Sequence, residues 1–407
     1  MRAIFLCDLN NFYASCEAVN DKKLIGKPVA VSGSVEDRKG VVIACNYQAK
    51  DFGVKVGDIV FEARQKCPNI VIKEADFELY NYYSKKVREI YLKYTNYVEP
   101  FSIDECYLDV TNSKIFGSPF SIAQKIKDEV KQKIGLTLSI GISFNKTFAK
   151  IASEFKKPDA ISEVNFNDFK QKIWTLDISK MIGVGKRLEV RLKKSNINTI
   201  GDLAGVDENY ISGLLGKVGR DLKAYASGFD NRPVELYSNY IKPKSVGNST
   251  TFYRDLSSKQ DLMLAFLIIS ESVVRRMIKY NLNEAKTLKV YAKYTNLTKF
   301  SKQVSFCYPT RNTEIIAKKA LETFYKFFPQ NPVRSLGIKV CNFDSGFKTQ
   351  SIFETKNEKN DVDKVVYEIN KKFNKKAIFK ANNLFDQKIA QSFDKEGLQK
   401  KEDEPKN

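Results

Sequence analysis

Three acidic residues set in short apolar segments constrain this chain more than any other feature. Asp8 ends the apolar run 3–7, and the pair Asp104-Glu105 interrupts the apolar stretch 98–110. Two carboxylates about 4 Å apart repel by roughly 4 kcal/mol at an effective dielectric constant near 20. A divalent cation turns this repulsion into attraction, and oxygen ligands without histidine suit Mg²⁺ or Mn²⁺. We therefore predict a fold that brings an N-terminal acid against a mid-chain acidic pair at a metal site.

The excess of basic residues indicates a polyanionic partner. The 407 residues include 68 Lys and Arg against 48 Asp and Glu, a formal charge of +20. Residues 241–345 hold 18 Lys and Arg against 7 Asp and Glu, so more than half of the excess lies in about a quarter of the chain. Such charge is typical of proteins that bind nucleic acid or an anionic membrane surface. The longest apolar run, 262–269, is too short to span a bilayer, so we expect nucleic acid and no membrane contact.

The residue types that are missing exclude several kinds of chemistry. The chain has no histidine, which excludes a His general base, a Ser-His triad and His-ligated zinc. Seven cysteines without a CxxC pair predict reduced, mostly buried thiols. The first eight residues lack the long apolar core of a secretory signal peptide. We expect a cytoplasmic protein with roughly two to four folding units.

Apolar periodicity predicts an α+β protein. Strands are expected over residues 3–8, 28–32, 40–44 and 136–143, and helices over 61–66, 77–94, 121–134 and 146–155. The segments 98–103 and 106–110 predict an antiparallel hairpin with a tight turn at Asp104-Glu105. This order favours a sheet with helices on one face. A second unit alternates strand, helix, strand, strand, helix and strand, over residues 246–253, 260–280, 287–295, 302–308, 313–328 and 334–343.

Two glycine hairpins between these units are candidates for contact with phosphate. Residues 182–186 and 215–220 each combine glycines with a following basic residue. Glycine lets backbone N–H groups at a helix N-terminus point toward an anion, although an ordinary helix–turn–helix pair is the alternative. The residues concerned are Gly183, Gly185, Lys186, Gly216, Lys217, Gly219 and Arg220. Five lysines on two adjacent predicted strands either share a sheet face or belong to a solvated surface: Lys286, Lys289, Lys293, Lys299 and Lys302.

Several long blocks of the sequence resemble the Y-family of translesion DNA polymerases. They are residues 7–17, 33–34 with 40–42, 46–54, 99–111, 149–153 with 156–158, and 244–247, and they recur in the family's order over about residues 1–345. The hairpin block is similar to the DNA polymerase IV branch of that family. The opening block is also similar to the catalytic subunit of the polymerase V branch, so the branch stays open at this point.

The resemblance implies a multidomain right-hand polymerase. A ferredoxin-like palm is expected from residues 1–10 and 76–165, and small fingers from 11–75. The helical thumb, with helix-hairpin-helix motifs, is expected at 166–231, followed by a linker at 232–244. An α/β little finger at 245–345 would grip duplex DNA, and 346–407 would form a C-terminal tail.

The resemblance also implies roles for individual residues. Asp8, Asp104 and Glu105 would hold two Mg²⁺ per site, with the Leu9 carbonyl as a further ligand and Mn²⁺ as a substitute. Tyr13 matches the steric gate, an aromatic ring under the sugar that excludes a 2′-hydroxyl. The triphosphate would be bound by Tyr47, Lys50 and Lys157, with Ser102 as an extra contact. The two glycine hairpins, with Lys289 and Lys293, are the expected DNA contacts.

The function that the resemblance implies is low-fidelity, template-directed DNA synthesis past lesions, by nucleotidyl transfer from a dNTP to a primer 3′-hydroxyl. Primer-template DNA and dNTPs are the expected partners of a monomeric enzyme. A sliding clamp is a further expected partner, although residues 382–385 match its binding peptide only faintly and equally fit a loop. Three alternatives remain: a polymerase V-like subunit that needs accessory partners, a catalytically silent DNA-repair scaffold, and a palm-type nucleotidyl cyclase.

Overall fold

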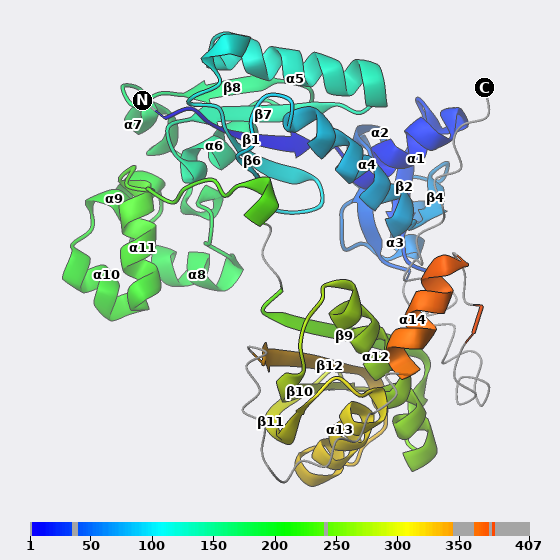
Figure 1. Ribbon diagram of the computed structural model, residues 1–407. Helices are drawn as coiled ribbons and strands as arrows, with labels where there is room; N and C mark the ends of the chain where they lie inside the picture. Colours follow the sequence, from blue (N-terminus) through cyan, green and yellow to red (C-terminus); the bar gives the residue numbers. More distant parts are fainter. Residues whose placement is uncertain (1, 35–39, 240–242, 345–361, 374–376, 379–407) are drawn as a thin grey trace. The chain divides into compact units, whose positions relative to one another are not determined.

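The chain folds as two compact units, residues 1–31 with 42–240 and residues 32–41 with 241–407. The computed structural model describes residues 2–34, 40–239, 243–344, 362–373 and 377–378 (Figure 1). Among these residues, no helix combines the length and apolar character needed to cross a membrane. The candidate clamp peptide at 382–385 lies outside the described residues.

A five-stranded sheet forms the centre of the first unit, in the order β5-β6-β1-β7-β8. Its strands are β1 (Ile4–Leu9), β5 (Val98–Pro100), β6 (Glu105–Asp109), β7 (Leu138–Ser143) and β8 (Ile161–Val164). All neighbours are antiparallel except β7 and β8, which are parallel. With α4 (Phe77–Tyr91) and α5 (Pro119–Ile134), these strands make the βαββαβ pattern of a ferredoxin-like fold. The expected α+β class is confirmed.

The two faces of this sheet are both covered, which corrects the expectation of helices on one face only. Phe5 and Cys7 of β1 join the core formed with α4 and α5, because alternate residues of a strand point to opposite faces. Ile4 and Leu6 face the other way and pack with Ala149 of α6 (Lys146–Ser153). In Figure 1, α5 and α6 accordingly lie on opposite sides of the sheet.

Helix α6 approaches the sheet so closely that one position of β7 admits only glycine. A Cβ atom at Gly141 would lie 2.0 Å from the carbonyl oxygen of Ala149 and 2.4 Å from the backbone nitrogen of Ser153. Real Cβ contacts are never this short, so any side chain at Gly141 would push α6 outward. This contact holds α6 tightly against β7 at the position that pairs with Leu6 of β1.

A smaller sheet and a set of short helices complete the first unit. The sheet has the order β3-β2-β4, formed by Val42–Cys45, Val29–Ser32 and Val71–Glu74. The helices beside it are α1 (Phe12–Asn20), α2 (Tyr47–Asp51) and α3 (Val60–Lys66). After β8 the chain is helical, with α7 (Phe169–Ile173), α8 (Lys186–Lys194), α9 (Ile200–Gly205), α10 (Glu208–Leu215) and α11 (Lys217–Ala226).

A buried carboxylate ties this helical segment to the start of α6. Asp230, only 1% exposed, accepts hydrogen bonds from the Thr147 N–H at 3.1 Å and the Thr147 hydroxyl at 2.8 Å. The guanidinium of Arg232 donates to both oxygens of Asp230 at 2.7 Å. Asn145 adds a bond from its amide to the Gly228 carbonyl at 3.1 Å. These contacts hold the segment that follows α11 against the start of α6.

The second unit follows the predicted alternation closely. Its elements are β9 (Ser245–Leu256), α12 (Lys259–Lys279), β10 (Ala285–Tyr294), β11 (Lys299–Thr310), α13 (Thr313–Phe327) and β12 (Val333–Phe343). The antiparallel sheet has the order β11-β10-β12-β9. Leu288, Val290 and Ala292 of β10 enter the core formed with α12 and α13, so the alternate residues of β10 lie on the sheet face away from that core.

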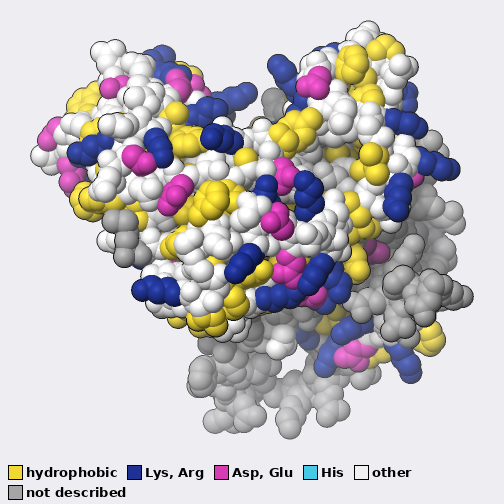
Figure 2. Space-filling view, turned by 90° about the horizontal axis from the view of Figure 1, so that it is seen from above, with side chains coloured by type: hydrophobic (Ala, Val, Ile, Leu, Met, Phe, Trp, Pro, Cys, Tyr) yellow, Lys and Arg dark blue, Asp and Glu magenta, His cyan; other side chains and the backbone are white. Residues whose placement is uncertain are grey.

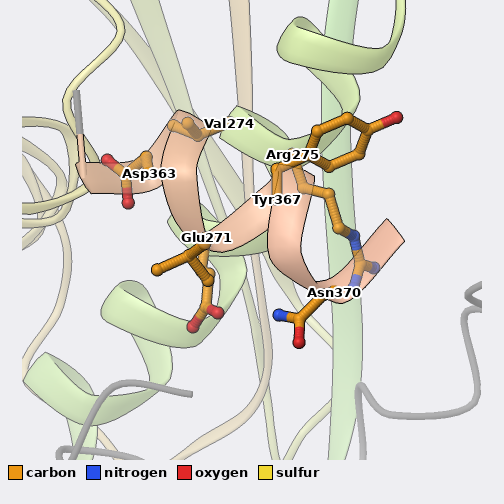
Figure 3. A pocket seen from close by; sticks show the side chains of 7 residues that line it. Glu271, Val274, Arg275, Asp363, Tyr367 and Asn370 are labelled. Atoms are coloured by element: carbon orange, nitrogen blue, oxygen red, sulfur yellow. The ribbon is translucent and has the colours of Figure 1, made fainter. Parts of the chain in front are cut away.

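A helix from the expected tail packs on this second unit. Helix α14 (Val362–Lys372) contacts α12, and Asp363 accepts a bond from the Thr313 N–H at the start of α13 at 3.2 Å. Figure 3 shows the small cavity between α12 and α14, about 30 Å³, lined by residues such as Glu271, Arg275 and Tyr367. It has room for little more than a water molecule, so we assign it no ligand.

Candidate active site

Asp8 of β1 and Glu105 of β6 stand directly opposite each other in the central sheet. Residues in this relation project from the same face, with Cβ atoms about 5 Å apart. Asp8 is only 7% exposed. Burial raises the pKa of Asp8 to about 7, Lys157 opposes the rise, and the neighbouring Glu105 adds to it. Two like charges held opposite each other destabilise a sheet, so the arrangement favours a bound cation.

Lysines compensate the two acids in the structure. The Lys157 ammonium lies 2.8 Å from an oxygen of Asp8 and 2.8 Å from an oxygen of Glu154. Lys150 of α6 forms an ion pair with Glu105. The face of the sheet that carries the acids is therefore lined by basic side chains from α6 and the segment after it.

Glu154 is a member of this site that sequence reasoning missed. Single carboxylate oxygens of Asp8, Glu105 and Glu154 all lie within 4.8 Å of one another. Glu154 follows directly after α6, whose position depends on its close contact with Gly141. The only signal in the sequence was an acid three residues before Lys157, which by itself is common on exposed helix ends.

Asp104 lies in the bend before β6 and lines the same pocket as Asp8. Ser102 shapes this bend, because its hydroxyl donates to Asp104 at 2.5 Å and accepts from the Glu105 N–H at 3.0 Å. Ser102 is not among the residues that line the pocket, so the geometry gives it the role of holding the bend. The predicted turn at Asp104-Glu105 is misplaced, because the bend between β5 and β6 spans residues 101–104 and Glu105 already pairs with Asp8 as part of β6.

The pocket beside the acids has a volume of about 340 Å³ and is lined by the other predicted nucleotide contacts. Leu9 and Tyr13 come from β1 and α1, and Tyr47 and Lys50 come from α2. The Lys50 ammonium lies 2.5 Å from the side-chain oxygen of Asn11 and 4.7 Å from the centre of the Tyr47 ring. Further lining residues are Asn10, Phe12, Ile43, Ala44, Cys45, Val56 and Lys157.

The donor set of this pocket fits a hard divalent cation. Asp8 and Asp104 line the pocket together with Leu9. Glu105 and Glu154 lie outside the pocket lining but form the acidic cluster with Asp8, a cluster that does not include Asp104. The sulfur atoms of Cys7 and Cys106 lie on the opposite face of the sheet, in the core with α4 and α5. Cys45 lines the pocket, but its thiol donates to the Val54 carbonyl at 3.6 Å and it is not part of the acidic cluster. All-oxygen ligands of this kind favour Mg²⁺ or Mn²⁺ over zinc.

The glycine hairpins occur where they were expected, with one difference. Gly185 caps the start of α8, and Gly216, with φ of 63°, caps the start of α11. Gly183 has φ of 89°, and the basic residues Lys186, Lys217 and Arg220 are exposed.

Gly219 differs because it is buried inside α11, where its N–H donates to the Gly216 carbonyl at 3.1 Å. A Cβ there would lie 2.4 Å from the Ile211 carbonyl oxygen. Glycine at 219 therefore serves the packing of α10 on α11, and we withdraw it as a phosphate contact.

The sheet of the second unit carries lysines on the face away from its helices. Lys289 and Lys293 of β10 lie on that face. Their cross-strand partners add Lys339 of β12 and Lys299 of β11. Lys302 pairs with the buried Val290 and places its ammonium over the Phe327 ring of α13, so it belongs to the other side. Basic side chains are also spread over the face of the molecule seen in Figure 2, with acidic ones between them.

Comparison with known proteins identifies the class of this site. Residues 7–154 match the model of the impB/mucB/samB family, and residues 243–352 match the model of that family's C-terminal domain. A DNA polymerase IV of Acetivibrio thermocellus is 42% identical over 343 residues, covering 84% of this chain and 86% of that protein. DNA polymerase IV 1 of Bacillus subtilis is 35% identical over 388 residues, covering 94% and 93%.

Solved structures agree with this result. A Y-family DNA polymerase chimera of Dbh and Dpo4 superposes with a TM-score of 0.75 at 25% identity, covering 84% of this chain and 99% of that one. The chain belongs to the impB/mucB/samB family of Y-family DNA polymerases. It is a DNA-directed DNA polymerase of the translesion class, as expected from the sequence. The relatives favour the DNA polymerase IV branch over a polymerase V-like subunit and over a silent scaffold.

Proposed function

We propose that this enzyme extends a primer with dNTPs through a site in which Asp8, Asp104, Glu105 and the Leu9 carbonyl hold two Mg²⁺, with Mn²⁺ as a substitute. The observation that carries the proposal is the direct opposition of Asp8 and Glu105, with Asp104 in the same pocket. When bound, the cations would activate the primer 3′-hydroxyl and neutralise charge on the triphosphate.

The remaining pocket residues bind and orient the incoming nucleotide. Lys157, Lys50 and Tyr47 donate charge-assisted and neutral hydrogen bonds to the β- and γ-phosphates. Tyr13 lies under the sugar and excludes a 2′-hydroxyl by contact. The support is that all four side chains line one pocket with Asp8. Lys50 binds phosphate as a point charge, without the two-pronged geometry of an arginine.

The DNA is gripped outside this pocket. We assign phosphate contacts to Gly183, Gly185 and Lys186 at the start of α8, and to Gly216, Lys217 and Arg220 at the start of α11. Lys289 and Lys293 contact the duplex from the open sheet face of the second unit. As domains, we propose residues 1–10 and 76–165 as palm, 11–75 as fingers, 166–231 as thumb and 245–345 as little finger.

Three further properties complete the proposal: the enzyme works as a monomer, in the cytoplasm, and associates with a sliding clamp. Size-exclusion chromatography with light scattering tests the first property. Binding of the full-length chain to a purified sliding clamp, before and after removal of residues 382–407, tests the clamp contact and its location together.

Primer extension on undamaged and abasic templates tests the catalytic assignment. We expect Asp8→Asn and Asp104→Asn to lower the extension rate by about 1,000-fold or more, because each change removes an anionic ligand worth several kcal/mol in the transition state. DNA binding should persist in both variants. The matched control is Asp109→Asn at the far end of β6, the strand that begins directly after Asp104; the Asp109 side chain accepts the Thr111 N–H at 2.9 Å. Normal extension by Asp8→Asn would refute the metal site.

A further inference from the structure

The ring of Tyr13 is held by an aromatic cluster that belongs to another helix. Tyr13 of α1 stacks on Tyr80 of α4, with ring centres 4.4 Å apart and planes 18° apart. Phe77, one turn earlier on α4, meets both rings edge-on at 5.9 Å. Helices α1 and α4 are in contact, so the position of the Tyr13 ring depends on α4 as well as on its own helix.

Tyr80 is itself anchored back to α1 by a buried carboxylate. The Tyr80 hydroxyl donates to an oxygen of Glu17 at 2.7 Å. Tyr80 is 0% exposed and Glu17 is 4% exposed, and a buried carboxylate without a donor would be costly. Glu17 follows Tyr13 by four residues in α1, so the two side chains lie on the same face of that helix, one turn apart.

Tyr80 therefore touches α1 at two points, and the two contacts act in different ways. The stacked ring blocks the movement of Tyr13 away from the pocket, because offset-stacked aromatic pairs attract beyond the area that they bury. The hydrogen bond to Glu17 prevents Tyr80 from sliding or turning. Neither Glu17 nor Tyr80 lines the pocket, so neither can touch the nucleotide.

We propose that Tyr80 and Glu17 are positioning residues that set the choice between deoxyribonucleotides and ribonucleotides by fixing the Tyr13 ring. The inference rests on the proposed role of Tyr13 as the gate against a 2′-hydroxyl. It extends that role to two residues that are 63 positions apart in the chain and meet only in the fold.

The test measures the ratio of kcat/KM for a dNTP to kcat/KM for the matching rNTP in single-nucleotide insertion. We expect Tyr80→Leu, which removes the stack, to lower the ratio about 10-fold, because 1.4 kcal/mol corresponds to a factor of ten. Tyr80→Phe keeps the ring but leaves Glu17 without its donor, and should lower the ratio about 3-fold. Glu17→Gln keeps an oxygen acceptor and should stay close to wild type. Tyr82→Leu, on an exposed part of α4, is the matched control and should change nothing.

A double-mutant cycle separates this inference from the gate itself. Tyr13→Ala alone should lower the ratio, and adding Tyr80→Leu should then lower it no further. An unchanged ratio in Tyr13→Ala would overturn the gate assignment and with it the inference.

Two other outcomes would overturn the inference alone. One is full discrimination by folded Tyr80→Leu and Tyr80→Phe proteins. The other is a loss of discrimination from Tyr80→Leu that is as large in the Tyr13→Ala background as in the wild-type background. A purely structural role would lower the melting temperature and both kcat/KM values together, leaving their ratio fixed. If Tyr80→Leu does not fold, the comparison of Tyr80→Phe with Glu17→Gln decides the question. A lower ratio in Tyr80→Phe alone supports the inference, and equal ratios in the two variants overturn it.

Discussion

Lys157 links the acids of the site to the proposed triphosphate position. Its ammonium bonds both Asp8 and Glu154, and the backbone just after it is tied to the end of β1, where the Asp159 N–H donates to Asn10 at 2.9 Å. The lysine is thus held at the edge of the pocket by two acids and an anchored backbone. An ammonium group placed in this way can neutralise the acids and can also bind a phosphate group when a nucleotide enters the pocket.

Removal of the Lys157 ammonium should weaken nucleotide binding more than it slows chemistry. We expect Lys157→Ala to raise the KM for dNTP by roughly 10- to 100-fold, since a hydrogen bond to a charged group contributes about 1.5–3 kcal/mol. Steady-state single-nucleotide insertion measures KM and kcat separately. Lys156→Ala removes an exposed neighbouring lysine and should leave KM near wild type. An equal effect of both variants would show that general charge, and not the position of Lys157, matters.

At the residue scale, the sequence predicted those site members that stand in an unusual local context. Asp8 and Glu105 could be predicted because acids within apolar strands are rare. The sequence could not predict the roles of Glu154, Glu17 and Tyr80. Each lies in a helix or directly after one, where such residues are common, and only the packing of the fold brings it to its partner. The fit of α6 over Gly141 and the contact of α1 with α4 are tertiary features with no local signal.

At the scale of elements, the predicted strands and helices were mostly found because apolar spacing is a local property. The alternation in the second unit and the helix at 77–91 are clear cases. The errors concern relations between elements. Glu105 belongs to β6 because Asp8 pairs with it, and α6 covers the second face of the sheet because Gly141 makes room for it.

The contacts of Asp230 with Thr147 and Arg232 join the segment after α11 to α6, and they make the stability of the fold depend on pH. Burial alone would raise the pKa of Asp230, but the bonds from Arg232 and Thr147 outweigh it and lower the pKa below its usual value. A carboxyl that binds its proton more weakly in the folded state stabilises the fold above the unfolded pKa of about 3.9. That contribution is lost as the pH falls through the lowered folded value.

Asp230→Asn should therefore cost more stability at neutral pH than in acid. We expect a loss of roughly 2 kcal/mol at pH 7, since a buried hydrogen-bonded charge is replaced, and a smaller loss at pH 3.5. Urea unfolding of the wild type and the variant at both pH values measures the difference. Asp51→Asn, at an exposed position, controls for general charge. A difference in free energy that does not shrink in acid would argue against an ionised Asp230 in the fold.

At the scale of the whole molecule, the basic charge is organised by the pairing of strands. The sequence predicted that some of five lysines share a sheet face, but the register decides which. Lys289 and Lys293 lie on the open face, whereas Lys302 lies over Phe327 and Lys286 pairs with Asp344 at 2.9 Å. Lys293 stands opposite Lys299 in the sheet, an arrangement of like charges that a polyanion would relieve.

This division of the lysines predicts how DNA affinity depends on salt. Each phosphate contact that a lysine makes releases counterions, so log K falls with log salt concentration by about 0.9 per contact. The double variant Lys289→Ala with Lys293→Ala should bind primer-template DNA more weakly and reduce the magnitude of the salt slope by about 2. The double variant Lys286→Ala with Lys302→Ala removes the same charge from β10 and the neighbouring strand β11 and should leave the slope nearly unchanged. Fluorescence anisotropy titrations at several salt concentrations measure both slopes. If the two double variants shift the slope equally, the net charge of the unit guides DNA binding and the open sheet face has no special part in it.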